Sequence, residues 1–413
     1  HRSVKDQRRG AGPYPAMALF FLACGSSMLL VALSSAFVGL YQRYKAATFT
    51  YYAYNCWAPA KPAAPAEERE IASLSEVHVA YGSDVNNLVA ALHSMISLSR
   101  RLLAPGACRI HLIVPKEDVA VTLQMVECFR REVADLPAVP QVRVHELRPN
   151  RLTPQSPTTS LPSLARYYLP DYLPAAARRA LWLDTDTVVR ADVAPLYRMR
   201  MRRAFAAALE PRWVSWRNCW FLPNAHNVSD RFRPLIKNLD SATFNPGVML
   251  VDLQRWRSQH ITEAFEDLYV SLAHRAGDLL AINVLFQGTT SHTSQEPEAG
   301  REFDVLDWRW NTNAFYVFLH HSWACYFCQM PHRCVDEARI LQWSGVPKPW
   351  AFRMVGLLEI ANIPMHLHLF DAHIPASDAA ECRDFKLDTS QPLWGEPSLP
   401  GRWRGPLNRT EDP

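Results

Sequence analysis

Segments typical of β-strands alternate with segments typical of α-helices from residue 77 onwards, and this alternation constrains the fold more than any other feature. The strand-like segments are short and rich in β-branched or apolar residues, whereas apolar residues in the helix-like segments recur every three or four positions. Strands are expected at 77–81, 110–114, 142–147, 180–183, 203–209 and 247–251, and helices at 88–99, 119–133 and 261–273. Such alternation predicts an α/β fold with a Rossmann-like, mostly parallel central sheet that helices cover on both faces.

An acidic pair follows the most apolar of these strands. The segment Ala180-Leu181-Trp182-Leu183 is apolar throughout, as expected of a central strand, and it ends directly in Asp184-Thr185-Asp186. Ligands of such sheets bind beyond the carboxyl ends of the strands. Two carboxylates one residue apart can hold a divalent cation, and hard oxygen ligands favour Mn²⁺ or Mg²⁺. That cation would neutralise the charge on a departing nucleoside diphosphate. The alternative is a turn with two solvated acids.

Four ordered motifs around this pair resemble glycosyltransferase family 8. They read PSLARYYLPDYLP, RALWLDTDTVVRADVAPLY, FNPGVMLVDLQRW and WSGVPKPW, and the resemblance covers about residues 77–350. The family includes glycogenin, bacterial lipopolysaccharide galactosyltransferases, plant galacturonosyltransferases and the animal glycosyltransferase-8-domain proteins. The resemblance implies a GT-A fold in a single catalytic domain, a UDP-sugar donor, Mn²⁺ and retention of the anomeric configuration.

The resemblance also assigns donor-binding roles residue by residue. Ala80, Tyr81 and Asp84 in VAYGSD match the first-strand block that holds uracil and ribose. Arg166 in SLARYYLP matches the family's basic residue beside the diphosphate and sugar, where a rigid cationic fork suits both binding and catalysis. Thr185, between the two acids, is placed with the donor-binding residues. The alternatives are an ordinary strand-to-helix turn for the first block and a helix-surface position for the arginine.

Two later segments are expected to contact the donor sugar. Asn245 in FNPGVML matches the asparagine that contacts the sugar, and Gly247 allows close approach of the backbone. Asp278 and Asn283 in GDLLAIN match the family's Asp-Gln-Asp-x-x-Asn block, although Leu279 replaces the usual glutamine. Asp278 and Asn245 are therefore predicted catalytic residues, Asp278 as a stabiliser rather than as an assigned nucleophile. Helix capping is the alternative role for this aspartate.

The third metal ligand departs from the family pattern. The last motif usually begins with a histidine that completes the metal site, and Gln342 stands at that position. A glutamine carbonyl can ligate a hard cation, but as a weaker ligand than imidazole for Mn²⁺. We expect Asp184, Asp186 and Gln342 to hold the metal with reduced affinity. Gly345 and Lys348 in the same motif are expected to bind the diphosphate.

The N-terminal region predicts a membrane anchor. Residues 17–40 form an uncharged run of 24 residues, which is long enough to cross a hydrocarbon core about 30 Å thick. Arg8 and Arg9 precede it, which favours a cytoplasmic N-terminus and a type II protein of the Golgi or another secretory-pathway membrane. A cleaved signal peptide that starts at Met17 is the alternative. We divide the chain into a cytoplasmic tail (1–16), a transmembrane signal anchor (17–40), a Pro/Ala-rich stem (41–72), a lumenal catalytic domain (73–370) and a C-terminal extension (371–413).

Charge and cysteine content agree with a lumenal enzyme. The net charge is +4, but residues 1–50 carry six Lys or Arg against one Asp, which leaves about −1 for the rest and no basis for a nucleic-acid partner. Eight of the nine cysteines lie outside the apolar run, an even number that permits disulfides in an oxidising lumen. Asn227 and Asn408 begin glycosylation sequons.

Two groups of histidine and cysteine remain open to more than one reading. The first group could form either a zinc site or an insertion held by disulfides, and the family pattern has no zinc at this place. It comprises His320, His321, Cys325, Cys328, His332 and Cys334. His366 and His368 in MHLHLF alternate like one face of a strand, where packing or surface roles are favoured over ligation.

Three functions compete. The leading one is transfer of a sugar from a UDP-sugar to the hydroxyl of a glycan, glycoprotein or polysaccharide acceptor that the sequence does not identify. The second is an inactive sugar-nucleotide- or glycan-binding protein of the same fold, because Gln342 and Leu279 depart from the family. The third, a phosphate-processing hydrolase, lacks a candidate base near the acidic pair.

Overall fold

The computed structural model of the chain describes residues 75–148, 152, 160–209, 243–271, 278–286, 303–313, 337–344, 348 and 367–386. All of them belong to one unit of the chain, Ala60–Pro413. Within these ranges, no helix combines the length and the apolar character needed to cross a bilayer. The expected anchor, stem, sequons and histidine/cysteine cluster, together with Gly345 and His366, lie outside the described residues.

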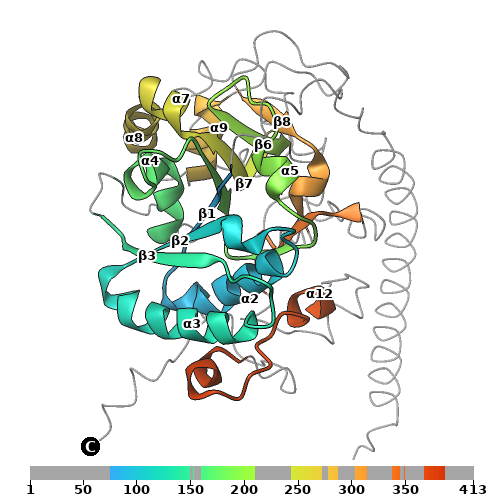
Figure 1. Ribbon diagram of the computed structural model, residues 1–413. Coiled ribbons are helices and arrows are strands. Elements are labelled where there is room, and N and C mark those ends of the chain that lie inside the picture. Colours follow the sequence, from blue (N-terminus) through green and yellow to red (C-terminus); the bar gives the residue numbers. More distant parts are fainter. Residues whose placement is uncertain are drawn as a thin grey trace, which may run out of the picture. The chain divides into compact units, whose positions relative to one another are not determined.

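A seven-stranded sheet forms the centre of the fold (Figure 1). Its strand order is β3-β2-β1-β4-β7-β6-β8. The strands are β1 (Val77–Gly82), β2 (Cys108–Val114), β3 (Gln141–Glu146), β4 (Arg179–Leu183), β6 (Phe205–Leu209), β7 (Phe244–Asp252) and β8 (Asp304–Leu306). The pairs among β3, β2, β1 and β4 are parallel, as is β6 with β8, whereas β7 runs antiparallel to both neighbours. The predicted mostly parallel α/β sheet is therefore confirmed, with β4 as its middle strand.

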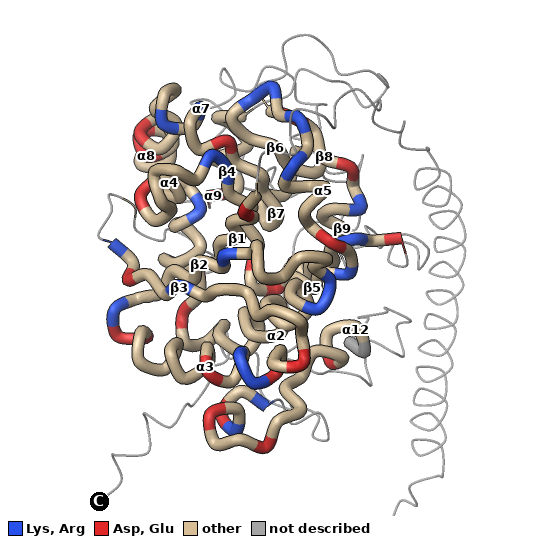
Figure 2. The backbone as a smooth tube through the Cα atoms, in the orientation of Figure 1, with Lys and Arg blue, Asp and Glu red and all other residues tan. Residues whose placement is uncertain are grey.

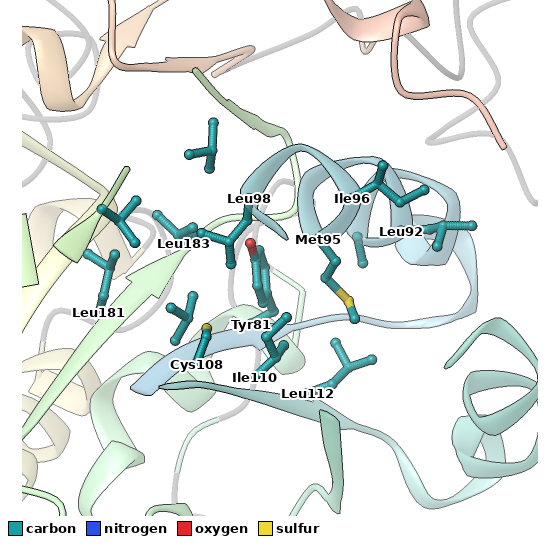
Figure 3. Packing of buried hydrophobic residues seen from close by; sticks show 14 of the residues in the cluster. Tyr81, Leu92, Met95, Ile96, Leu98, Cys108, Ile110, Leu112, Leu181 and Leu183 are labelled. Atoms are coloured by element: carbon teal, nitrogen blue, oxygen red, sulfur yellow. The ribbon is translucent and has the colours of Figure 1, made fainter. Parts of the chain in front are cut away.

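Helices cover both faces of the sheet. On one face α2 (Leu88–Ser99) and α3 (Val119–Glu132) pack against a cluster that includes Tyr81, and Figure 3 shows this ring among Leu98, Cys108 and Ile110. The other face is covered by the 3₁₀ segment Pro162–Tyr168 and by α4 (Leu169–Tyr172), α7 (Leu253–Ser258), α8 (Ile261–Ser271) and α9 (Asp278–Leu285). Each large apolar side chain that is fully buried contributes about 1.5–3 kcal/mol.

The helix α3 shows how the pattern produces the packing. Its buried residues Val121, Met125 and Phe129 recur every four positions and so lie on the face turned to the sheet. Arg130 and Arg131 occupy its last turn, where positive charge interacts favourably with the helix dipole.

A second, three-stranded sheet pairs distant parts of the chain. It has the order β5-β10-β9, with β5 (Thr187–Val189), β10 (Ile340–Gln342) and β9 (Thr312–Asn313). The antiparallel register pairs Thr187 with Gln342, so the strand that follows the acidic pair lies beside the predicted third metal ligand.

Three histidines form a diagonal row across β1, β2 and β3, on the sheet face that α4 covers. His78 Nδ1 lies 3.1 Å from His111 Nε2, and His111 Nδ1 lies 3.0 Å from His145 Nε2. Burial is the largest cause that lowers the pKa of each imidazole, and together with the neighbouring histidines and arginines it lowers the pKa of His111 to about 3. The row is therefore a chain of neutral rings joined by hydrogen bonds.

The C-terminal described segment closes over α3. A disulfide joins Cys128 on α3 to Cys382, and the Glu132 carboxylate accepts hydrogen bonds from the Ala376 and Ser377 backbone amides at 3.0 and 2.7 Å. Cys382 and its neighbour Phe385 are fully buried in the cluster on the α2/α3 face. This segment, to which the sequence assigned no role, is part of the packed core.

The expected strand-like alternation around His368 is wrong. Residues Leu367–Asp371 form a short helix, α12, in which Phe370 packs against Trp343 and His93 with ring centroids 5.7 and 4.5 Å apart. A segment of about five residues is too short for its apolar spacing to distinguish a period of two from a helical turn, so the packing decides.

Candidate active site

The acidic pair lies in a turn that is held by backbone hydrogen bonds on both sides. The Asp184 amide donates to the Gly247 carbonyl of β7 at 2.8 Å, and the Trp343 amide donates to the Asp186 carbonyl at 2.9 Å. Asp186 is buried, with 6% of its surface exposed. The end of β4, β7 and the residues after β10 thus meet at one place.

Gln342 reaches both acids from β10. Its Nε2 lies 3.2 Å from Asp184 Oδ2 and 3.2 Å from Asp186 Oδ1. A Cβ on Gly247 would come within 2.0 Å of that nitrogen, so only glycine lets the amide lie against β7. The close approach expected at Gly247 is therefore made by the side chain of Gln342.

Two cations complete this cluster. The Lys348 ammonium contacts the Asp186 carboxylate and donates to the Trp343 carbonyl at 2.7 Å. Arg166 Nη1 lies 3.3 Å from Asp184 Oδ1, and its Nη2 lies 3.6 Å from Asp278 Oδ2. Only 5% of Arg166 is exposed, so the helix-surface alternative for this arginine is wrong.

The charges of the cluster do not balance among its described residues. Three acids, Asp184, Asp186 and Asp278, face two cations, Arg166 and Lys348. Burial raises the pKa of Asp184, and the Arg166 guanidinium opposes this effect. Burial likewise disfavours the charge on Arg166, but the neighbouring carboxylates raise the pKa of the guanidinium above its ordinary value. A cation bound between Asp184 and Asp186 would stabilise the charged forms of both carboxyls.

The donor atoms fit a hard divalent cation. Oxygens of Asp184 and Asp186 already converge on the Gln342 amide. Gln342 Oε1 is buried and has no hydrogen-bond partner among the described residues. Rotation of the amide by half a turn would exchange nitrogen for oxygen. The amide oxygen would then be a third ligand atom, a neutral one, beside the two carboxylates.

The predicted sugar-binding residues lie beside this cluster. Asn245 Oδ1 accepts from the Gly247 amide at 2.8 Å, and its Nδ2 donates to Ser344 Oγ at 3.2 Å. Asp278 begins α9 and accepts the Tyr167 hydroxyl at 2.9 Å. Asn283 instead bonds the backbone amide and carbonyl of Phe244, so its amide joins α9 to β7.

The first-strand block is only partly accessible. Ala80 and Tyr81 have no exposed surface, and the Tyr81 hydroxyl accepts a hydrogen bond from Ser94 within the core. Since this holds for their backbone as well, any contact of these two residues with a nucleotide would require a local rearrangement. Asp84 is half-buried, and its carboxylate accepts hydrogen bonds from the Asn86 amide and the Asn87 side chain, in the 3₁₀ turn Val85–Asn87 that precedes α2.

Most predicted site residues converge. The structure brings together Arg166, Asp184, Asp186, Asn245, Asp278, Gln342 and Lys348. Thr185 lies half-buried within the acidic turn. Lys, Arg, Asp and Glu are otherwise interspersed along the described elements (Figure 2).

Sequence reasoning missed two residues of the site. Trp182, expected only as an apolar strand residue, donates its indole N–H to Asp184 Oδ1 at 2.7 Å. Its position two residues before this acid was a usable signal, because residues i and i+2 of a strand share a face. Tyr167 follows Arg166 in the same motif, but nothing in the letters distinguishes a site tyrosine from a core one.

Comparison with known proteins identifies relatives of this chain. A family model described as Glycosyl transferase family 8 matches residues 78–353. The probable galacturonosyltransferase-like 3 of Arabidopsis thaliana is 30% identical over 190 residues, covering 45% of this chain and 49% of the relative. Glycosyltransferase 8 domain-containing protein 1 of Homo sapiens is 25% identical over 202 residues, covering 46% and 50%. The matched part of the chain thus spans about half the length of these relatives.

A solved structure shares the fold. The WbbM bifunctional glycosyltransferase in its apo form superposes with a TM-score of 0.52 at 16% identity, covering 74% of this chain and 50% of the other. The expected GT-A fold is confirmed.

Proposed function

This chain belongs to glycosyltransferase family 8, and we propose that it is a retaining transferase that moves a sugar from a UDP-sugar to an acceptor hydroxyl. The observation that carries the proposal is the convergence of Asp184, Asp186 and Gln342 with two cations, the buried Arg166 and the half-buried Lys348. Carboxylates that can hold a metal and cations that can hold a diphosphate lie within one cluster. Both can stabilise the charge that develops on a nucleoside diphosphate leaving group.

The donor diphosphate is proposed to bind between the acidic turn and the two cations. Asp184, Asp186 and the rotated amide of Gln342 would hold Mn²⁺ or Mg²⁺, which when bound neutralises charge on the leaving diphosphate. Lys348 would pair with the diphosphate as a point charge, and Arg166 would present a planar fork.

Nucleotide contacts are proposed for the remaining predicted residues. Ala80 and Tyr81, near the end of β1 next to β4, would contact uracil and ribose after a local rearrangement that uncovers them, and the half-buried carboxylate of Asp84, just after β1, would contact the same part of the donor. Thr185 and Gly345 complete the proposed donor site.

The sugar is proposed to lie against Asn245 and Asp278. Both side chains contact the residues that surround the acidic turn, through Ser344 and Arg166 respectively. Asp278 would stabilise positive charge on the sugar as the diphosphate departs, with no covalent intermediate assigned. The transferred sugar is proposed to be a hexose or a uronic acid, and the name of the galacturonosyltransferase-like relative supports the uronic acid.

A secretory-pathway location fits the described domain. The Cys128–Cys382 disulfide is of the kind that persists in oxidising compartments. We therefore propose a Golgi or other secretory-pathway membrane protein of type II, with residues 17–40 as its anchor and the domain in the lumen.

The alternative is a catalytically weak or inactive relative that binds sugar nucleotides or glycans. It is favoured by one observation, namely that the Gln342 amide and the Lys348 ammonium already satisfy the acidic pair. Leu279 in place of the usual family glutamine points the same way.

Release of UDP from a panel of UDP-sugars, with and without Mn²⁺, separates the two proposals. We expect metal-dependent release that Asp184→Asn abolishes, because the variant removes a carboxylate from the proposed metal site. Asp171→Asn, which changes an exposed acid of α4, is the matched control and should retain activity. Tight UDP binding without release from any donor would instead support the inactive relative.

A further inference from the structure

Two consecutive tyrosines follow Arg166, and their hydroxyls point to different partners. The Tyr167 hydroxyl donates to Asp278 Oδ2 at 2.9 Å, whereas the Tyr168 hydroxyl donates to Glu266 Oε1 at 2.6 Å. Both tyrosines are buried, at 0% and 7% exposure. The first hydroxyl therefore reaches the active-site cluster.

Tyr167 connects the two halves of that cluster. The Asp278 oxygen that accepts its hydroxyl also lies 3.6 Å from Arg166 Nη2, and the same guanidinium reaches Asp184 through Nη1. The guanidinium carbon of Arg166 lies 5.8 Å from the centroid of the Tyr167 ring. One phenol thus contacts both the sugar-side acid and the cation that this acid shares with the acidic turn.

The phenol itself is held rigidly. Its ring stacks on Phe265 with centroids 3.7 Å apart, at an angle of 20° between the ring planes. Burial, and then the charge of Asp278, raise the pKa of Tyr167 well above its ordinary value, so the hydroxyl keeps its proton and remains a donor. A rigid donor of this kind limits rotation of the carboxylate that accepts from it.

We propose that Tyr167 is a positioning residue for the donor sugar, whose hydroxyl fixes the Asp278 carboxylate in the orientation that receives the sugar. This inference rests on the proposed function of the cluster. It assigns to Tyr167 a role that depends on its hydroxyl group, since the ring alone would satisfy the packing against Phe265.

The proposal predicts a difference between binding of the nucleotide and binding of the intact donor. Tyr167→Phe keeps the stacked ring and removes the hydrogen bond to Asp278. We expect affinity for an intact UDP-sugar to fall about tenfold, as for loss of a hydrogen bond to a charged group, with affinity for UDP unchanged within about twofold. A general loss of folding would weaken both ligands equally.

Isothermal titration calorimetry with Mn²⁺ present measures the two affinities. The probes are UDP and whichever of UDP-glucose, UDP-galactose, UDP-xylose and UDP-galacturonate the wild-type chain binds most tightly. Tyr168→Phe is the matched control, because it removes the neighbouring buried hydroxyl from a bond to Glu266 and should leave both affinities unchanged. In an Asp278→Asn background, Tyr167→Phe should cause little further loss, since the two residues act together.

Four results would overturn the inference. If Tyr167→Phe weakened binding of UDP and of the UDP-sugar equally, the role of Tyr167 would be structural. If neither affinity changed, the hydroxyl would not position Asp278. A full tenfold loss that persists in the Asp278→Asn background would show that Tyr167 acts elsewhere. A wild-type chain that binds neither UDP nor any UDP-sugar contradicts the proposed function itself, and the inference then falls with it.

Discussion

The histidine row makes the stability of this domain sensitive to mild acid. His111 is 1% exposed and lies between His78 and His145. A positive charge on its ring would therefore be shielded from water and would lie between two other imidazoles. Glu76 beside His78 opposes the effect on that ring, but Arg109 and Arg143 add to it. At mildly acidic pH these three histidines therefore bind fewer protons in the folded state than in the unfolded chain.

The sign and size follow from linkage. The pKa of His111 is lowered from 6.5 to about 3, so its contribution to stability is fully present above pH 6.5 and is lost progressively as the pH falls towards 3. At pH 5, which is about 1.5 pH units below the pKa of His111 in the unfolded chain, protonation of this one residue stabilises the unfolded state by about 2 kcal/mol. The lowered pKa values of His78 and His145 act in the same direction.

Urea unfolding of the wild-type chain and of His111→Gln, at pH 7.5 and pH 5.0, tests this reasoning. Carboxylates and the other histidines titrate in both proteins, so the difference between the two reports His111 together with its coupling to His78 and His145. We expect the wild-type chain to lose about 2 kcal/mol more between the two pH values than the variant does. His260→Asn, which changes a histidine whose side chain is 78% exposed, should keep the wild-type dependence. Identical pH dependence in wild type and His111→Gln would refute the argument.

Two further predictions concern the site and the disulfide. Gly247→Ala places a Cβ against the side chain of Gln342, so we expect a loss of about 1–3 kcal/mol in unfolding free energy and weaker Mn²⁺ binding by calorimetry; wild-type values for both would show that the amide does not need this space. Replacement of both Cys128 and Cys382 by serine should lower the unfolding free energy by about 2–4 kcal/mol in urea titrations, and unchanged stability would show that the C-terminal segment holds α3 without its covalent bond.

The sequence predicted the elements well where periodicity was long or unmixed. The apolar run of β4 and the four-residue spacing in α3 each had one consistent interpretation, and the acids after Leu183 marked the functional edge of the sheet. The antiparallel direction of β7 was not predicted, because a strand pattern is the same in either direction.

The contacts within the site depended on pairing that no local pattern contains. Thr187 pairs with Gln342 across more than 150 residues, and only the family resemblance placed that glutamine near the metal. Tyr81 lies on a strand buried on both faces, where apolar residues continue without alternation and do not reveal which side chain faces a ligand. The row through His111 required the register of three strands, which the sequence does not supply.

The disulfide between α3 and the segment at Cys382 can form only late in synthesis of the chain. The two sulfurs are 254 residues apart in sequence, so at about 5–20 residues per second the second one leaves the ribosome roughly 13–50 s after the first. Every proposed catalytic residue is synthesised within that interval or before it. A chain that stops before Ala376 would contain every proposed catalytic residue but would lack Cys382 and Phe385 from its core. We expect such a chain to be less stable, with its proposed active-site residues all present.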